Sequence, residues 1–266
     1  MKRLAVVSQK GGVGKTTLSL NLAYALAKSG VRTLLLDVDP QGGVGLSLNG
    51  HGAARGLTGL LEGAPVDECL LTTRMPELVL CPIGDVAITA TPQLAASLED
   101  GSQMNALLGG LESRFDVVVV DTPPGFGGIT LGAMRATSNL IVPLQAEPIG
   151  LRSLPQLLQV VGDLSEQGTP TRMVGIVLSM LQQRIGESLG VAEEVWTRLP
   201  AELVLETTIP RDTVFLKASS AGVPLGLLRR PPPPLASLFD ALASEVLERL
   251  GVGTDEADDE PLSLFA

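Results

Sequence analysis

The feature that most constrains the fold is a glycine-rich loop between a buried strand pattern and a helical pattern. Residues 10–17 read KGGVGKTT, directly after the apolar run at residues 4–8, and helical spacing follows over residues 17–29. Glycines allow backbone N–H groups to surround a phosphate, and a helix N-terminus adds partial positive charge. A strand, a loop and a helix in this order predict a phosphate-binding site in an α/β protein.

The side chains of the loop fit the same chemistry. Lys15 is expected to reach the β and γ phosphate oxygens, and Thr16 offers a hydroxyl to Mg²⁺. The strict GxxxxGK(S/T) pattern is broken because Gln9 stands where its first glycine belongs, and Lys10 adds a second cation that the loop does not need. A chance glycine-rich turn leaves Lys10 unexplained. The other expected nucleotide contacts are Gly11, Gly12, Val13, Gly14 and Thr17.

The remainder of the chain alternates short apolar runs with amphipathic stretches. Runs rich in Val, Leu and Ile, typical of strands buried on both faces, occupy residues 33–37, 78–83, 117–121, 140–143 and 174–178. Helical spacing occupies residues 104–111, 130–137, 151–164 and 187–199. This alternation predicts an α/β fold with a doubly wound, mostly parallel sheet and helices on both faces.

The C-terminal part contains weaker patterns. We expect a further strand at residues 203–209, a short helix at 212–221 and a stiff proline joint at 231–234. A last helix places one apolar face inward, formed by Leu235, Leu238, Phe239, Leu242, Val246 and Leu250. We therefore expect one domain over residues 1–250 and an acidic, disordered tail over residues 251–266.

Charge and cysteine content exclude several classes of protein. The formal net charge is −10, so contact with nucleic acid requires a local basic patch. Cys69 and Cys81 form no CxxC pair, which favours structural thiols in a reducing compartment and supplies no metal-ligand set. Because the start lacks a signal-peptide pattern and no apolar run reaches about 18 residues, we expect a cytoplasmic protein. The single histidine, His51, is interpreted as a loop residue.

The motifs together resemble those of the ParA/MinD superfamily of ATPases. KGGVGKTT resembles its deviant Walker A loop, LLLDVDPQG at residues 34–42 is similar to the family's LLDxDPQG segment, and VVVDTPP at residues 118–124 is similar to its Walker B region. PLQAEP at residues 143–148 and TIPRD at residues 208–212 extend the resemblance over roughly residues 1–250. The resemblance implies a P-loop ATPase that binds ATP and Mg²⁺ and hydrolyses ATP slowly to ADP and phosphate.

Residue roles follow from this chemistry together with the resemblance. Asp121 ends a strand beside the phosphate loop and is expected to hold Mg²⁺ through water, with Thr16 completing the coordination. Asp37 ends another strand and is expected to support the metal shell. Asp39 matches the family position that orients the attacking water; alternatively, it is a turn residue before Pro40.

Further implied roles concern the dimer and the nucleotide. Lys10 matches the lysine that reaches the nucleotide of a partner subunit, which predicts an ATP-dependent homodimer. Pro210 and Asp212 are expected to contact the nucleotide. We expect switch segments at residues 38–47 and 122–130 that respond to the γ-phosphate.

The superfamily contains several functions, and the sequence separates some of them. An iron-sulfur member needs a cysteine after the Walker B segment, whereas both cysteines here precede it. A MinD-like membrane role needs a basic C-terminal helix, whereas the last helix and the tail are acidic. Amidoligase-like members share the loop, but no substrate pocket can be traced for them from the sequence.

A ParA-like role implies nonspecific DNA binding by the ATP dimer. Arg184, Arg211 and Lys217 are the candidate DNA contacts. Similar proteins often read IPRNVRLSEAPSHGK, whereas residues 209–223 read IPRDTVFLKASSAGV, so Val214 replaces an expected arginine.

The sequence therefore predicts a ParA/Soj-like, ATP-dependent switch that segregates or positions DNA or another large cargo. It would be associated with the nucleoid, and a ParB-like or cargo-adaptor partner would stimulate its hydrolysis. The alternative is an orphan regulatory or scaffold ATPase that acts on a protein complex without binding DNA, and Val214 supports this alternative.

Overall fold

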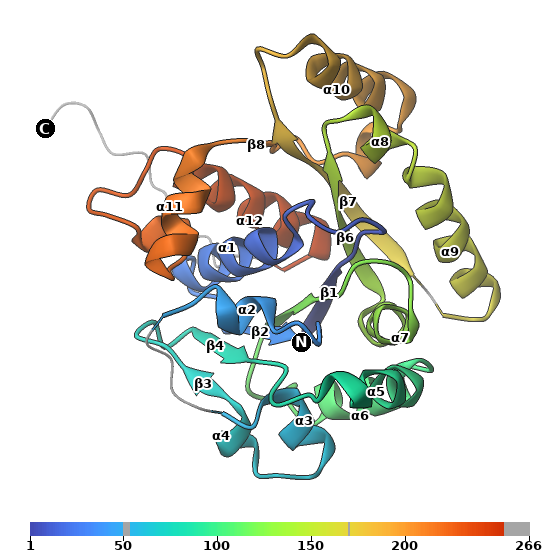
Figure 1. The fold of residues 1–266 in the computed structure, drawn as a ribbon, viewed down its shortest axis with the longest axis vertical. Helices are drawn as coiled ribbons and strands as arrows, with labels where there is room; N and C mark the ends of the chain where they lie inside the picture. The colour runs from blue at the N-terminus through green and yellow to red at the C-terminus, as the bar shows by residue number, and fades with distance from the viewer. Residues whose placement is uncertain (50–53, 170, 253–266) are drawn as a thin grey trace, which may run out of the picture.

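The fold is built on one eight-stranded sheet. The computed structural model describes residues 1–49, 54–169 and 171–252. The strand order is β3-β4-β2-β5-β1-β6-β7-β8, and every neighbouring pair is parallel except β3 with β4 (Figure 1). This topology confirms the predicted doubly wound α/β fold.

The central strands are apolar on both faces, as their composition predicts. All side chains of β2 and β5 are buried, and alternate residues of β5 face two separate core clusters on the two sides of the sheet. The strands are β1 Lys2–Val6, β2 Thr33–Asp37, β3 Leu71–Thr72, β4 Leu78–Cys81, β5 Val117–Asp121, β6 Asn139–Gln145, β7 Arg172–Leu181 and β8 Ile209–Pro210.

Helices cover both faces of the sheet. One core cluster is closed by α1 Lys15–Lys28, α11 Thr213–Ala221 and α12 Ala236–Leu250. The opposite cluster is closed by α3 Gly56–Leu61, α6 Ser102–Gly109, α7 Gly128–Thr137, α9 Leu154–Glu166 and α10 Gly186–Arg198. The other helices are α2 Gly43–Leu46, α4 Val66–Cys69, α5 Thr91–Leu98 and α8 Pro148–Leu151, with 3-10 turns at Ile88–Ala90, Ala201–Leu203 and Leu225–Leu227.

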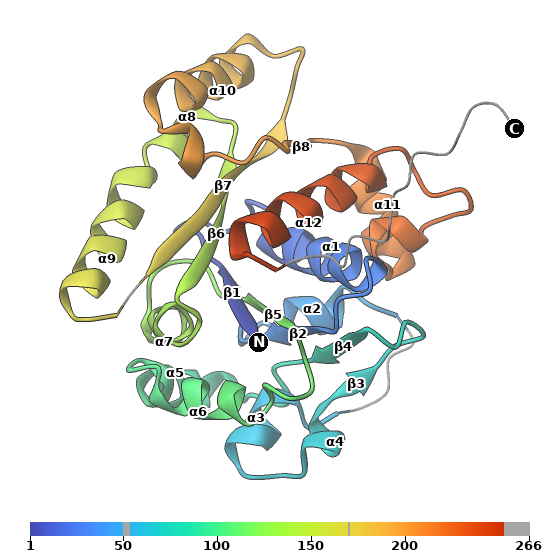
Figure 2. The same ribbon diagram turned by 180° about the vertical axis from the view of Figure 1, so that it is seen from behind.

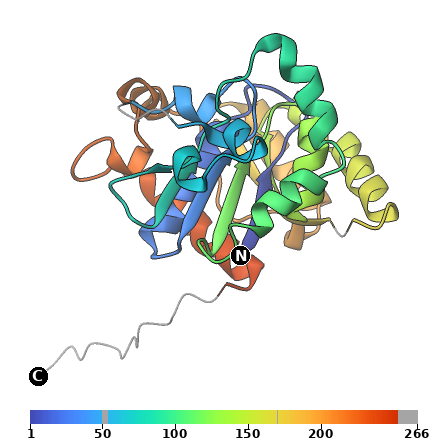
Figure 3. The same cartoon turned by 90° about the horizontal axis from the view of Figure 1, so that it is seen from below.

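The last helix packs as the sequence predicts. Figure 2 shows α12 beside α1, and Figure 3 gives the same fold from below. The buried side chains of Phe239, Leu242 and Val246 belong to the core that the two helices share. Within the described ranges, no helix is long and apolar enough to cross a membrane. Cys69 and Cys81 are buried free thiols. The predicted tail, apart from Gly251 and Val252, and His51 lie outside the described residues.

The strand expected at residues 203–209 is mostly wrong. Only Ile209–Pro210 joins the sheet as β8, and Val204 makes one isolated bridge to Ile176. The reason is a side chain that competes for the backbone: the Glu245 carboxylate of α12 accepts the N–H groups of Glu206 at 2.7 Å and Thr207 at 3.3 Å. These amides are therefore satisfied by a side chain instead of by β7.

Other differences concern short or interrupted elements. The helix expected over residues 151–164 begins three residues later, as α9, and Leu151 is the last residue of α8. Pro155 lies in the first turn of α9, where its missing N–H costs little. The antiparallel edge strand β3 has only two residues and carries no apolar run that could announce it.

Candidate active site

The glycine-rich loop joins the carboxyl end of β1 to the start of α1. Gly12 and Gly14 have φ values of 77° and 90°, in the left-handed region that favours glycine. Gly14 caps α1, and the described residues provide neither a side-chain cap nor an acidic side chain in its first turn. The N–H groups of the first turn of α1 are therefore available, together with those of the loop, to bind an anion.

Lys15 is a desolvated cation at the centre of the loop. Its side chain is buried, and Nζ donates to the Lys10 carbonyl oxygen at 3.3 Å. Burial lowers the pKa of Lys15, while the carboxylates of Asp121 and Asp39 oppose that shift. A buried ammonium beside two carboxylates is suited to bind the oxygens of a phosphate chain.

Asp121 ends β5 and is held by two hydroxyls of α1. Thr16 Oγ1 donates to Asp121 Oδ2 at 2.7 Å, and Ser19 Oγ donates to Asp121 Oδ1 at 2.8 Å. Burial raises the pKa of Asp121 to about 6, although both hydroxyls and Lys15 lower it. The carboxylate is thereby fixed beside the hydroxyl that is expected to bind Mg²⁺.

Asp37 lies opposite Asp121 in the β2–β5 pairing. Its Oδ1 accepts the Asp39 N–H at 3.0 Å, and its Oδ2 accepts the Val44 N–H at 3.0 Å. Burial, followed by the charge of Asp121, raises the pKa of Asp37 to about 7. Asp37 therefore anchors the segment that leaves β2, and its support of a metal shell stays a prediction.

Asp39 lies at the start of that segment and is half-buried. Its Oδ1 accepts the Gln41 N–H at 2.9 Å, and its carbonyl oxygen accepts the Gly42 N–H at 2.8 Å. These contacts form the turn that the sequence offered as the alternative role. The turn also holds the Asp39 carboxylate near Lys15. The orientation of an attacking water by Asp39 stays a prediction.

The donor set suits Mg²⁺. Mg²⁺ is bound through oxygen, commonly by one or two protein side chains together with waters and substrate phosphates. In the described part of the chain, no cluster of three or more His, Cys, Asp or Glu side chains could hold a metal alone. The hard oxygens of Thr16 and Asp121 therefore fit an ion that takes its other ligands from water and a nucleotide.

The predicted switch segment at residues 38–47 packs on the phosphate loop, and the segment at residues 122–130 is bonded to the chain that leads from β1 into the loop. A Cβ built on Gly43 would lie 3.0 Å from Thr16 Oγ1, so α2 packs closely on the loop. On the other side, the Gly125 N–H donates to the Ser8 carbonyl oxygen at 3.0 Å, and Thr122 Oγ1 donates to the Val6 carbonyl oxygen at 2.7 Å. Their response to a γ-phosphate stays a prediction.

A cavity of about 430 Å³ opens beside the loop. Gly14 and Thr17 line one side of it, and Pro210 and Asp212 line another. Asp212 is fixed because its Oδ1 caps α11 by accepting the Val214 N–H at 2.7 Å. The structure thus brings the two expected nucleotide contacts from the distant TIPRD segment to the loop.

The candidate DNA contacts are only partly gathered. Arg184 and Arg211 are exposed and line one hollow of about 780 Å³, whereas Lys217 lies on α11 outside that lining. Arg211 Nη1 lies 3.7 Å from Glu147 Oε1. Val214 is half-buried against the α1–α12 core cluster, which explains an apolar residue at that position.

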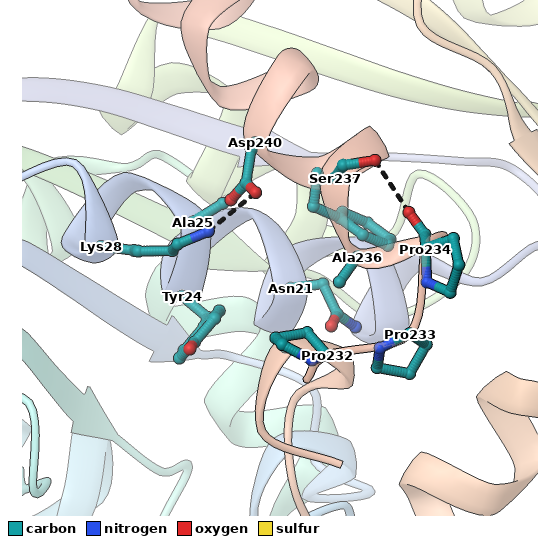
Figure 4. Close-up of a pocket in the computed structure, with 12 residues that line it drawn as sticks. Asn21, Tyr24, Ala25, Lys28, Pro232, Pro233, Pro234, Ala236, Ser237 and Asp240 are labelled. Atoms are coloured by element: carbon teal, nitrogen blue, oxygen red, sulfur yellow. Dashed lines mark hydrogen bonds and ion pairs between the residues drawn. The ribbon is translucent and has the colours of Figure 1, made fainter. Parts of the chain in front are cut away.

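The proline joint forms a separate cavity of about 290 Å³ between α1 and the start of α12 (Figure 4). Asn21 links α1 to the 3-10 turn at Leu225–Leu227: its Nδ2 donates to the Thr17 carbonyl oxygen of α1 at 2.8 Å, and its Oδ1 accepts the Leu225 N–H at 2.7 Å. An ion pair of 2.8 Å between Lys28 and Asp240 closes one side. These contacts fix the C-terminal segment to the helix that carries the phosphate loop.

Two buried serines of the site were missed by sequence reasoning. Ser19 binds Asp121, and Ser179 Oγ donates to the carbonyl oxygen of Val13 in the loop at 3.1 Å. Ser19 could have been found, since it follows Thr16 by three residues and so shares its helix face. Ser179 carries no comparable signal, because only the sheet brings β7 to the loop.

Comparisons with known proteins agree with this geometry. The model of an AAA domain family matches residues 1–173. The chain is 36% identical over 256 residues to the chromosome-partitioning ATPase Soj of Thermus thermophilus, covering 94% of this chain and 97% of that protein.

Solved structures with the same fold include ATPase and synthase members. The ATP complex of Cyanothece McdA matches with a TM-score of 0.79 and 25% identity, covering 95% of this chain and 97% of that one. Cobyrinic acid a,c-diamide synthase from Mycobacterium smegmatis, with a bound ATP analogue and magnesium, matches with a TM-score of 0.75 and 27% identity, covering 94% and 96%.

Proposed function

Because the chain belongs to the ParA/MinD family of P-loop ATPases, we propose that it is an ATP- and Mg²⁺-dependent switch that segregates or positions DNA or another large cargo. One observation carries the proposal: the buried Lys15 and Asp121 and the half-buried Thr16 lie together at the phosphate loop, where Lys15 Nζ donates to the Lys10 carbonyl oxygen and Thr16 Oγ1 donates to Asp121. The name of the Thermus relative, a chromosome-partitioning ATPase, supports the choice of cargo.

The loop residues would bind and neutralise a triphosphate. Backbone N–H groups of the loop and of the α1 start would surround the phosphates, and Lys15 would contact their outer oxygens. Thr16 and Asp121 would hold Mg²⁺, which supplies charge neutralisation at the phosphates. Pro210 and Asp212 would confine the base in the neighbouring cavity.

Hydrolysis needs an oriented water and a neutralised γ-phosphate. Asp39 is held in its turn at the edge of the loop, and its carboxylate would orient the water for in-line attack. Lys10 would reach the nucleotide of a second subunit, so that two chains complete each other's sites. The proposed active form is therefore an ATP-bound homodimer with slow hydrolysis of ATP to ADP and phosphate.

DNA is the proposed matrix on which the switch works. Arg184, Arg211 and Lys217 would contact phosphates nonspecifically, which implies association with the nucleoid in the cytoplasm. For this, Arg211 must exchange Glu147 for a DNA phosphate. A ParB-like protein or a cargo adaptor would stimulate hydrolysis and release the dimer.

The second candidate is a scaffold ATPase that acts on a protein complex without DNA. Two observations favour it: Val214 is half-buried where an arginine would be expected, and Arg211 is already paired with Glu147. In this case the ATP-bound dimer would form but would not bind duplex DNA.

Nonspecific duplex binding separates the two candidates. Binding is measured with ATP, with ADP and without nucleotide over a series of salt concentrations, using Asp39→Ala to hold the ATP dimer. Salt-sensitive binding that requires ATP and is lost when Arg184, Arg211 and Lys217 are replaced supports the DNA matrix. A demonstrated ATP dimer that does not bind DNA supports the scaffold function.

A further inference from the structure

The hydroxyl of Ser19 differs in its partner from four other described hydroxyls within helices. Ser and Thr side chains inside a helix commonly donate to the carbonyl oxygen of the preceding turn. Thr137, Ser165, Thr197 and Ser244 do so here, each donating to the residue four positions earlier. Ser19 instead donates across to the end of β5, to Asp121 Oδ1 at 2.8 Å.

The contact is fully enclosed. Ser19 and Asp121 are both 0% exposed, so solvent does not provide an alternative partner for the carboxylate at this side. Thr16, one turn earlier on the same face of α1, donates to the other oxygen at 2.7 Å. Two hydroxyls from one helix thus grip both oxygens of one carboxylate and fix its rotation about the Cβ–Cγ bond.

This grip matters for a carboxylate that acts on a metal ion. A carboxylate with one free oxygen can rotate, whereas one held at both oxygens presents its lone pairs in a fixed direction. Thr16 is itself the expected metal-binding hydroxyl, so its contact alone does not keep Asp121 in place independently of the ion. Ser19 is the only described partner of Asp121 Oδ1 among side-chain donors, and it stands outside the loop.

We propose that Ser19 is a positioning residue for Mg²⁺, which orients the Asp121 carboxylate toward the ion without touching the ion or the nucleotide. The inference rests on the proposed binding of ATP and Mg²⁺ and adds to it a residue of α1 that no phosphate-loop pattern contains. Loss of a hydrogen bond behind a metal-binding side chain commonly weakens metal affinity by about 10- to 100-fold.

The test measures Mg²⁺ binding separately from nucleotide binding. The affinity for ADP is determined by calorimetry in EDTA and over a titration of Mg²⁺, for the full chain and for Ser19→Ala. We expect the ADP affinity of Ser19→Ala in EDTA to stay within about 2-fold of that of the parent chain. The Mg²⁺ concentration at which the gain in ADP affinity is half-maximal should rise about 10-fold. Ser19→Thr, which keeps the hydroxyl, should restore the parent midpoint.

Thr137→Val is the matched control, because it removes a buried helical hydroxyl that donates to Ala133 at 2.8 Å and does not contact Asp121. It should leave both quantities unchanged. An unchanged Mg²⁺ midpoint in Ser19→Ala overturns the inference, as does an equal loss of ADP affinity with and without Mg²⁺, which would indicate a general packing role.

Two further outcomes are distinguishable. If the parent chain binds no ADP at all, the proposed function fails, whereas a parent with a normal Mg²⁺ gain and an unaffected Ser19→Ala contradicts only the role of Ser19. If Ser19→Ala does not fold, Ser19→Cys keeps the volume with a weaker donor. A parent-like midpoint in Ser19→Cys, compared with Thr137→Val, then overturns the inference.

Discussion

The phosphate loop and the basic surface formed by Arg184, Arg211 and Lys217 differ in how exposed their polar side chains are and in how many partners those side chains have. At the loop, Lys15, Ser19 and Asp121 are buried and bonded to partners within the site. On the surface, Arg184 and Lys217 are exposed, and Arg211 has one ion pair of 3.7 Å. Buried hydrogen bonds and ion pairs fix the orientation of the side chains that phosphoryl transfer requires. Exposed charges attract an anionic partner without fixing its orientation, and salt screens that attraction. The two regions should therefore differ in how strongly single substitutions act.

The largest effect is expected at Lys15. Lys15→Ala removes the buried cation that would contact the phosphate oxygens, so nucleotide binding should fall by more than about 100-fold, equivalent to about 2.7 kcal/mol or more. Calorimetry with ADP and Mg²⁺ measures this. Lys28→Ala is the control, because Lys28 lies on the same helix but is exposed and paired with Asp240. Retained binding in Lys15→Ala would contradict the phosphate-loop assignment.

Asp39→Ala should act on turnover and spare binding. Without the carboxylate that would orient the water, hydrolysis should fall by at least about 10-fold while ATP still binds, so the ATP dimer should accumulate. Phosphate release gives the rate, and light scattering after size-exclusion chromatography gives the dimer fraction. The exposed Asp85 supplies the control Asp85→Ala. Normal hydrolysis in Asp39→Ala would assign the orientation of water to another group.

Lys10→Ala tests whether the site is completed by a second chain. Binding of ADP by the monomer should change little, whereas ATP-dependent dimerisation or turnover should weaken, because a second cation no longer reaches the γ-phosphate. The same scattering and phosphate-release measurements apply. Unchanged behaviour in both would remove the role of Lys10 across the dimer.

The same contrast explains which parts of the molecule could be predicted from the sequence. Strands such as β2 and β5 can be predicted from the sequence, because a strand buried on both faces is apolar along most of its length. The loop is equally visible, because glycine, lysine and threonine are needed at fixed spacing. The buried strands and the loop each depend on residues that are close together in the sequence.

What the sequence could not predict depends on contacts between distant residues. The strand expected near residue 206 is displaced by Glu245, which lies 39 positions away and accepts two of its amides. Val214 reads as a missing basic residue, whereas in the structure it is half-buried against the α1–α12 core. Contacts of this kind join residues that are distant in the sequence, so they leave no periodic pattern in the local sequence from which they could be predicted.

The surface arginines should show smaller, salt-dependent effects. Removal of one phosphate contact should weaken the binding of the ATP dimer to duplex DNA severalfold and reduce the slope of log affinity against log salt by about 1. Arg184→Ala and Lys217→Ala are expected to do this for all DNA sequences alike. The control Arg74→Ala removes an exposed arginine from the turn between β3 and β4. An equal effect of Arg74→Ala would mean that overall charge, not this surface, attracts DNA.

The last prediction concerns the pH dependence of stability in the protein without metal and nucleotide. Burial raises the pKa of Asp37 to about 7, above its ordinary value near 4 in an unfolded chain. Between these values the folded state binds more protons than the unfolded state, so the free energy of unfolding should fall as pH rises from about 4 to 7. Hydrogen bonds from Ser102 lower the pKa of Asp100, so its contribution has the opposite sign and changes only below about pH 4, outside this range.

Thermal unfolding in EDTA measures this slope. Asp37→Asn should reduce it, and the remainder should come from Asp121, whose pKa burial raises to about 6. The absolute midpoint of the variant is less informative, because an amide nitrogen cannot accept the Val44 N–H that Asp37 Oδ2 accepts at 3.0 Å. Asp100→Asn is the matched control: it removes an exposed carboxylate and should leave the descending slope in place. If Asp37→Asn retains the parent slope, the buried strand ends do not govern the titration, and the loop is no more sensitive to pH than the exposed surface.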